Sequence, residues 1–194
     1  MTTTYDLAPA AAQVARLADG VNHDQLDSAT PCEDWTVALL LDHLLGLTAA
    51  FTAAANKTPL RADTTELDGR LPSDWKVQLH ERLDALVAAW NTPEAWQGEA
   101  EAGGVVMPAE TMGVVALDEL VLHGWDLARA TGQAFHADPV SVTACLNFAA
   151  AMSEPGQEAD REGLYGPVVP VPADAPDLER LLGLTGRDPQ WTPA

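Results

Sequence analysis

Apolar residues recur at helical spacing in at least four segments of this 194-residue chain. A wide stripe of this period is typical of a helix that buries one face. Strand-like alternation with a period of two is nearly absent. The sequence therefore predicts an all-α fold, a bundle of four or five helices. The broadest stripe is formed by Val37, Leu40, Leu41, Leu44, Leu45 and Phe51.

Capping residues indicate where the helices begin and end. Asp34 or Thr36 is expected to cap the second helix, which runs to about residue 55, and Ser73 the third. Gly132 follows the fourth helix as a stop signal, and Pro139 lies in the first turn of the fifth. The predicted helical segments are residues 5–17, 36–55, 75–90, 109–131, 139–152 and 178–186.

The composition changes after residue 152. The following segment is rich in Pro and Gly and does not continue the helical pattern. We therefore expect a helical bundle over residues 1–152 and, over residues 153–194, a Pro-rich C-terminal arm with an extra short helix, packed on the same domain. Residues 91–110 form a turn-rich connection with room for a short irregular strand.

The chain is strongly acidic, with a formal net charge of −19 and a pI near 4.3. Such a surface repels phosphate backbones and anionic lipid, which excludes nucleic acid and membrane surfaces as partners. No signal segment opens the chain, and no apolar run is expected to span a bilayer. Cys32 and Cys145 are too few for a disulfide framework, so two reduced thiols in a cytoplasmic protein are expected.

A carboxylate and two imidazoles form the candidate metal site. Glu119 and His123 lie four residues apart, about 40° apart around a helix axis. His43 lies in the most apolar part of the second helix, and a bundle core can bring it against the fourth. This ligand set suits zinc or a related divalent ion and leaves one coordination position open. From the spacing alone, hydrogen-bonded core residues are an equally good interpretation.

Other candidates lie around this set. Asp126 could orient a ligand, pair with Arg129 or cap a local turn. Cys32 could be a fourth ligand, a reactive thiol or a small packed residue. Trp35 and Trp125 could line the pocket mouth or belong to the core. The remaining histidines are expected at the surface: His23, His80 and His136.

Two segments together resemble a known family. "SATPCEDWTVALLLDHLLG" and "ELVLHGWDLARATGQ" are similar to the DinB/YfiT-like superfamily, in its mycothiol-dependent maleylpyruvate isomerase N-terminal domain branch. Within that branch the chain most resembles a group of uncharacterised actinobacterial metal-binding proteins. The resemblance implies a DinB-like four-helix bundle whose metal, zinc or otherwise nickel, is bound by His43, Glu119 and His123.

The resemblance also implies an activity. The metal would activate a mycothiol-type thiol as cosubstrate for S-transfer to a small electrophile or for thiol-assisted isomerisation of it. The isomerase carries a second domain that this chain is too short to hold, so a thiol S-transferase is expected rather than maleylpyruvate isomerase itself. The alternative is a metal-stabilised binding, stress-response or accessory module without turnover. A monomer or homodimer is expected.

Overall fold

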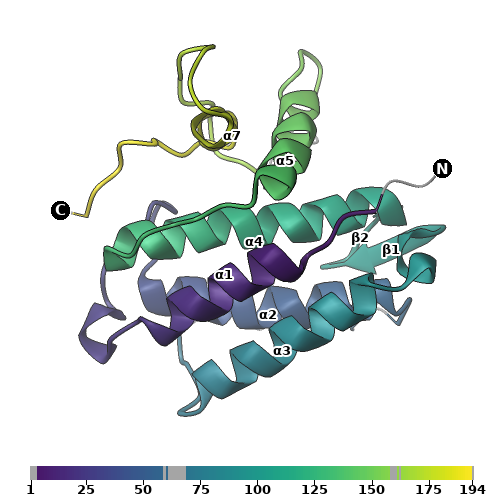
Figure 1. The fold of residues 1–194 in the computed structure, drawn as a ribbon, viewed down its shortest axis with the longest axis horizontal. Coiled ribbons are helices and arrows are strands. Elements are labelled where there is room, and N and C mark those ends of the chain that lie inside the picture. Colours follow the sequence, from purple (N-terminus) through teal and green to yellow (C-terminus); the bar gives the residue numbers. More distant parts are fainter. Residues whose placement is uncertain (1–3, 59, 61–68, 158–160, 162, 194) are drawn as a thin grey trace.

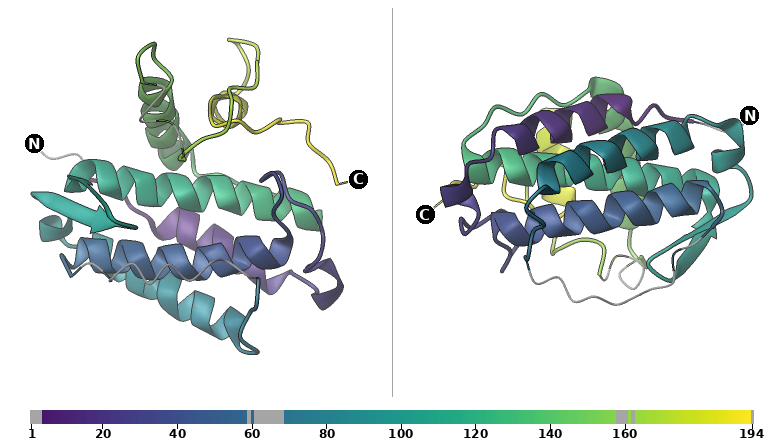
Figure 2. Two further views of the ribbon diagram at one scale, coloured as in Figure 1. Left: turned by 180° about the vertical axis from the view of Figure 1, so that it is seen from behind. Right: turned by 90° about the horizontal axis from the view of Figure 1, so that it is seen from below.

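The computed structural model describes residues 4–58, 60, 69–157, 161 and 163–193, and its core is a four-helix bundle (Figure 1). The bundle helices α1 and α2 each pack against both α3 and α4, so α1 and α2 lie diagonally opposite each other (Figure 2). The predicted all-α fold is confirmed. The four helices are α1 (Ala8–Asp19), α2 (Val37–Ala55), α3 (Trp75–Trp90) and α4 (Ala109–Thr131).

Two further helices form a separate layer on the outer side of α4. α5 (Pro139–Met152) packs against α4, and α7 (Asp177–Leu184) packs against α5 (Figure 1). The fifth helix is therefore not a member of the bundle but a support for the C-terminal arm. The division of the chain at residue 152 stays a prediction.

Capping hydrogen bonds and a glycine account for three of the helix ends. Thr36 Oγ1 accepts from the Leu39 backbone N–H at 3.3 Å and begins α2, and Asp138 accepts from the Ser141 N–H at 2.8 Å and begins α5. α4 ends at Gly132, whose φ of 68° is the left-handed conformation that glycine adopts without strain. These ends agree with the sequence-based predictions.

The predicted cap of α3 is wrong. Asp74, not Ser73, precedes the helix, and no side chain caps its first turn. The Asp74 carboxylate instead accepts from the Gln78 amide at 2.8 Å, one turn further on.

The connection between α3 and α4 contains more regular structure than the predicted irregular strand. A short 3₁₀ helix, η2 (Pro93–Trp96), leads into the antiparallel strands β1 (Glu99–Ala102) and β2 (Val105–Pro108). Gly103 and Gly104 connect the strands with φ values of 58° and 82°, as a tight two-residue hairpin turn requires. This hairpin is the only sheet in the described part of the chain.

The expectation that no apolar run is long enough to span a bilayer was wrong for helix α2. Its 19 residues are long and apolar enough to cross a bilayer by length and composition. In the structure, however, 56% of that stretch is buried, and it packs on α3 and α4. A core helix passes the same compositional test, so α2 carries no evidence for a membrane location.

Tryptophans close the hairpin end of the bundle core. Trp90 and Trp96 are almost completely buried, with ring centroids 4.9 Å apart in an edge-to-face arrangement. The indole N–H of Trp90 donates to the Phe51 carbonyl, and that of Trp96 donates to the Trp90 carbonyl. Both rings are therefore buried with their polar atoms satisfied, as aromatic cores require.

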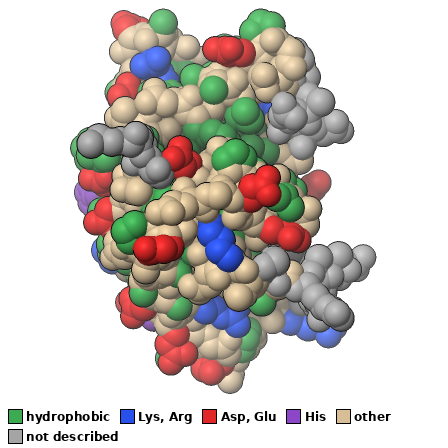
Figure 3. Space-filling model, turned by 90° about the vertical axis from the view of Figure 1, so that its right-hand side faces the viewer, with side chains coloured by type: hydrophobic (Ala, Val, Ile, Leu, Met, Phe, Trp, Pro, Cys, Tyr) green, Lys and Arg blue, Asp and Glu red, His purple; other side chains and the backbone are tan. Residues whose placement is uncertain are grey.

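The molecular surface reflects the acidic composition. Figure 3 shows one face on which acidic side chains are scattered between hydrophobic ones, with fewer basic groups. The net charge of −19 thus gives the molecule a negative field that acts on any charged ligand approaching it.

We expect Gly113→Ala to destabilise the bundle by about 1–2 kcal/mol, because an added methyl group overpacks a filled core. A Cβ there would lie 2.4 Å from the Trp96 ring and 2.8 Å from the Trp90 ring. Gly46→Ala on α2 is the matched control, since nothing lies within 4 Å of its Cβ position. The control should gain about 0.5–1 kcal/mol from helix propensity. Urea unfolding measures both, and equal stabilisation by the two changes would contradict the described packing.

Candidate metal centre

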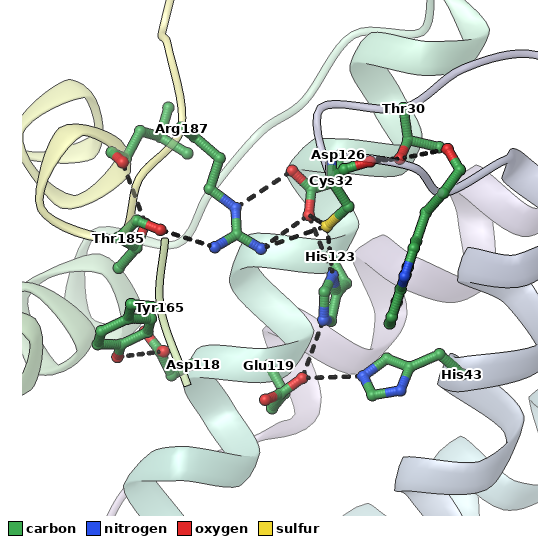
Figure 4. A network of polar contacts seen from close by, with 12 residues as sticks. Thr30, Cys32, His43, Asp118, Glu119, His123, Asp126, Tyr165, Thr185 and Arg187 are labelled. Carbon is green, nitrogen blue, oxygen red and sulfur yellow. Dashed lines mark hydrogen bonds and ion pairs between the residues drawn. The ribbon is translucent and has the colours of Figure 1, made fainter. Parts of the chain in front are cut away.

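Two helices bring the three predicted ligands together. Glu119 Oε2 lies 3.2 Å from His43 Nε2 and 3.0 Å from His123 Nε2 (Figure 4). The two imidazole ring centroids are 4.8 Å apart, and the three ligand atoms all lie within 4.8 Å of one another. α2 and α4 therefore place two nitrogens and one oxygen around a common point.

The electrostatics of this cluster favour positive charge. Burial alone would raise the pKa of Glu119, but hydrogen bonds with His123 and His43 lower it well below its usual range. Burial likewise opposes a charged His123, yet contacts with Asp126 and Glu119 raise its pKa well above the ordinary value. Two carboxylates thus act on one imidazole, and the cluster attracts a cation.

Asp126 fixes the orientation of His123. Its fully buried carboxylate accepts from His123 Nδ1 at 3.0 Å, which leaves Nε2 directed at Glu119. Burial raises the pKa of Asp126, but the Arg187 guanidinium and His123 together bring it down to about 2. The alternative pairing with Arg129 is not found, because the Arg129 guanidinium donates to the Trp191 carbonyl.

The loop before α2 is folded tightly over this cluster. The Thr30 hydroxyl donates to the Trp35 carbonyl at 3.0 Å and accepts from the Cys32 N–H at 3.2 Å. Asp34 takes a φ of 64°, a left-handed conformation that Asp tolerates better than most residues. This turn explains the pattern "TPC..W": it directs both Cys32 and Trp35 toward α4.

Trp35 covers the two histidines. Its ring meets His43 edge to face at 4.9 Å and stacks on His123 at 5.9 Å with an interplanar angle of 18°. Such a contact limits the rotation of both imidazoles. The prediction that Trp35 borders the pocket agrees with the structure.

Cys32 lies on the other side of His123 from Glu119. Its thiol donates to Asp126 Oδ2 at 3.1 Å and lies 3.8 Å from His123 Nδ1. It belongs to a second cluster, with His123 and Asp126, and not to the one that contains His43. The geometry therefore disfavours one of the roles considered for Cys32, namely that of a fourth ligand on the open side of the first cluster.

A cavity of about 830 Å³ opens above the cluster. Its floor includes His43, Glu119 and His123, and its walls come from the loop before α2 and from residues 163–191 of the C-terminal arm. The side chains of His43 and Glu119 are 27% and 20% exposed, so both reach the cavity. The site therefore has room for ligands beyond an ion.

Arg187 was not predicted from the sequence. Its guanidinium donates to Asp126 Oδ2 at 3.0 Å and to Asp126 Oδ1 at 3.3 Å, which connects the arm to α4 (Figure 4). The available signal was weak: an arginine in a very acidic chain, just after the last short helix. No periodic pattern indicates where the arm folds back.

A second contact between the arm and α4 was also not predicted from the sequence. The Tyr165 hydroxyl donates to the buried Asp118 carboxylate at 2.6 Å. Burial raises the pKa of Asp118 to about 7, although the Tyr165 hydrogen bond acts in the opposite direction. Asp118 directly precedes Glu119, so the arm contacts α4 on both sides of the candidate ligands.

The prediction for Trp125 needs correction. This side chain is 5% exposed, lies beside Arg129 and is absent from the cavity lining. On a helix it points away from the face that carries Glu119 and His123. His80 lies at the surface as predicted and pairs with Asp19 at 3.0 Å. His23 and His136 are also exposed.

The residues present fit a divalent ion. Ligand atoms about 2.1 Å from a tetrahedral ion lie about 3.4 Å apart. The 3.0 and 3.2 Å separations from Glu119 Oε2 to the two Nε2 atoms are close to this value. Nitrogen and carboxylate donors suit zinc or nickel, and the Asp126–His123 hydrogen bond is typical of the support given to histidine ligands.

Comparison with known proteins places the chain in a family. The sequence matches the mycothiol maleylpyruvate isomerase N-terminal domain over residues 7–128, more than half of its length, so the chain belongs to this family. Uncharacterised proteins from two strains of Mycobacterium tuberculosis are each 27% identical over 184 residues, 89% of this chain and 91% of theirs. No solved structure gave a significant match. The three candidate ligands lie inside the family match, whereas Arg187 lies beyond it.

We expect Arg187→Met to destabilise the protein by about 3 kcal/mol, because it leaves a buried carboxylate without its cation. The Arg187 and Asp126 side chains are 10% and 0% exposed. Arg180→Met is the matched control, since the Arg180–Asp177 pair is 43% and 54% exposed. The control should change stability by less than about 1 kcal/mol. If thermal unfolding gave the two variants equal stability, Arg187 would not have the structural role described.

Proposed function

We propose that this protein is a divalent-metal-dependent enzyme that activates a low-molecular-weight thiol of the mycothiol type. The thiol would be used for S-transfer to a small electrophile, or for thiol-assisted isomerisation of it. The observation that carries the proposal is the convergence of His43, Glu119 and His123 at the floor of a cavity of about 830 Å³. Membership of a mycothiol-related family supports the identity of the thiol.

The geometry favours a ligand role for Glu119. One carboxylate oxygen, Oε2, faces both Nε2 atoms at 3.0 and 3.2 Å, so it points between the imidazoles. A general base would instead have to stand apart from the ion, within reach of the proton that it removes. We therefore assign Glu119 to the metal together with His43 and His123, with zinc as the first choice and nickel as the second.

An open coordination position supports turnover. Cys32 is held by Asp126 beside Nδ1 of His123, away from the Nε2 atoms that face Glu119. The ion would then have three protein ligands, which is the catalytic pattern rather than the structural one. A bound ion would lower the pKa of a coordinated thiol, so that the thiolate forms at neutral pH.

The surrounding residues would prepare the site for this chemistry. Asp126 pairs with His123 Nδ1, so that His123 would present Nε2 to the ion, and Trp35 restrains both imidazoles. Leu122 and Leu164 add apolar surface to the cavity lining. In the proposed step, the thiol proton leaves to solvent and the thiolate sulfur forms a bond to the electrophilic carbon, while the π bond of that carbon or its bond to a leaving group breaks. The carbanion or leaving group that results takes up a proton from solvent. We expect this to take place in the cytoplasm of an actinobacterium, in keeping with the mycobacterial relatives.

The protein purified without chelator should contain about one divalent ion per chain. Glu119→Gln should weaken binding of that ion by about 100-fold or more, because an amide is a much poorer ligand than a carboxylate. Glu33→Gln is the matched control, since Glu33 lines the same cavity but lies outside the ligand cluster. Metal analysis and competition with a chromophoric chelator give both affinities. Equal metal affinity of the two variants would refute the assignment.

Adding mycothiol to the cobalt-substituted protein should produce a sulfur-to-metal charge-transfer band, because the thiol is expected to take the open position. His43→Ala should bind cobalt poorly and show no such band. His80→Ala, at an exposed histidine, should behave as the parent protein does. If the band were absent at saturating thiol with cobalt in place, the protein would be a metal-stabilised module without turnover.

A further inference from the structure

The only arginine or lysine among the described residues that line the cavity is already neutralised. Arg187 Nε and Nη2 donate to the two Asp126 oxygens, and Nη1 donates to the Thr185 carbonyl at 3.1 Å. Its side chain is 10% exposed. The guanidinium therefore offers little free hydrogen-bonding capacity to a carboxylate or phosphate group in the cavity.

Backbone donors beside Arg187 are occupied as well. The Gly186 N–H donates to the Gly183 carbonyl at 3.2 Å, and the Arg187 N–H donates to the Leu182 carbonyl at 2.8 Å. The Tyr165 hydroxyl, on the same wall, is taken by Asp118. These three donors are thus taken and are not available to bind an anion in the cavity.

When His43 and His123 hold an ion as neutral imidazoles, the remaining charged side chains of the cavity lining are acidic. Glu33 and Asp188 are exposed acidic residues on its rim, from the loop before α2 and from the arm. Glu119 and an incoming thiolate would together offset the two charges of a divalent ion. An anionic second substrate would therefore meet a net repulsive rim on a protein whose total charge is −19.

Apolar groups fill the remaining wall of the cavity. Leu122 comes from α4, whereas Leu164, Val169 and Trp191 come from the arm. Trp35 adds an aromatic surface next to the histidines. These groups suit a ligand with an apolar body, because burying apolar surface against them is favourable.

We infer that the electrophile used by this site is an uncharged molecule with an apolar body, such as an ester or ketone, and not a carboxylate anion. This inference rests on the proposed function, since it names the second substrate of the same thiol reaction. The carbon that accepts sulfur must be made electrophilic by a neutral group, such as a carbonyl conjugated to its double bond. As the carbon–sulfur bond forms, the π bond of that double bond breaks, and solvent protonates the resulting carbanion, so that thiol and electrophile together give an adduct with no added charge.

A matched pair of electrophiles tests the inference. The zinc protein with saturating mycothiol is given either dimethyl maleate or maleate, which differ in charge around the same double bond. Each rate is divided by the rate of the uncatalysed addition at the same pH, to remove intrinsic reactivity. The diester should be favoured by about tenfold or more, as expected for charge repulsion in a partly desolvated site. An equal or greater enhancement with maleate would overturn the inference.

Removing negative charge at the cavity rim provides a second test of the inference. The double variant Glu33→Gln, Asp188→Asn should raise the relative enhancement with maleate by a few-fold. The control double variant Glu81→Gln, Asp84→Asn removes the same charge from an exposed part of α3, away from this cavity, and should leave the preference unchanged. The same shift in both variants, or in neither, would count against a local electrostatic origin.

A binding experiment separates this inference from the proposed function. Dimethyl succinate and succinate carry the same ester or carboxylate groups without the electrophilic double bond, so their binding to the zinc–mycothiol protein does not require turnover. Ligand-observed NMR should detect the diester and give at least a tenfold weaker response for succinate. If no electrophile reacts but the diester binds selectively, the proposed reaction fails while the ligand class stands. Binding of succinate, or of neither compound, would overturn the ligand class itself.

Discussion

The buried carboxylate of Asp126 is the interaction on which the site depends. It accepts hydrogen bonds from His123 on its own helix, from Cys32 in the loop before α2 and from Arg187 in the C-terminal arm. A carboxylate without solvent contact is costly unless its hydrogen bonds and charge are met, and here both are. The same contacts that neutralise Asp126 therefore fix an imidazole, a loop and the cavity wall in one arrangement.

α4 carries three buried or half-buried carboxylates at or beside the site. Asp118, Glu119 and Asp126 are each matched by a donor from elsewhere in the chain. Tyr165 and Arg187 supply two of these donors from the arm, whereas Glu119 faces only imidazoles. This difference distinguishes carboxylates that hold the structure together from the one that is available to a cation.

Local sequence signals predicted the helices well because caps and apolar stripes act within a few residues, as at Thr36 and Gly132. Spacing placed Glu119 and His123 on one helical face but left open whether His43 meets them, and the resemblance to a known family joined the three. The path of the arm could not be predicted, because it depends on single long-range contacts such as Arg187 with Asp126. Trp125 was left open between pocket and core, although its position two residues after His123 places it about 200° around the helix from that ligand. The hairpin could have been predicted, because a Gly103–Gly104 pair is typical of a two-residue hairpin turn.

The distance along the chain between the partners of Asp126 has a consequence for biosynthesis. Arg187 is synthesised 61 residues after Asp126, and Cys32 precedes Arg187 by 155 residues. On the ribosome, the bundle helices are complete while the guanidinium that neutralises this carboxylate has not yet been made. Before the arm has docked, Asp126 lacks the cation that neutralises it in the folded protein. The three candidate ligands belong to the bundle, whereas the cavity wall that Arg187 connects to α4 consists of residues synthesised later.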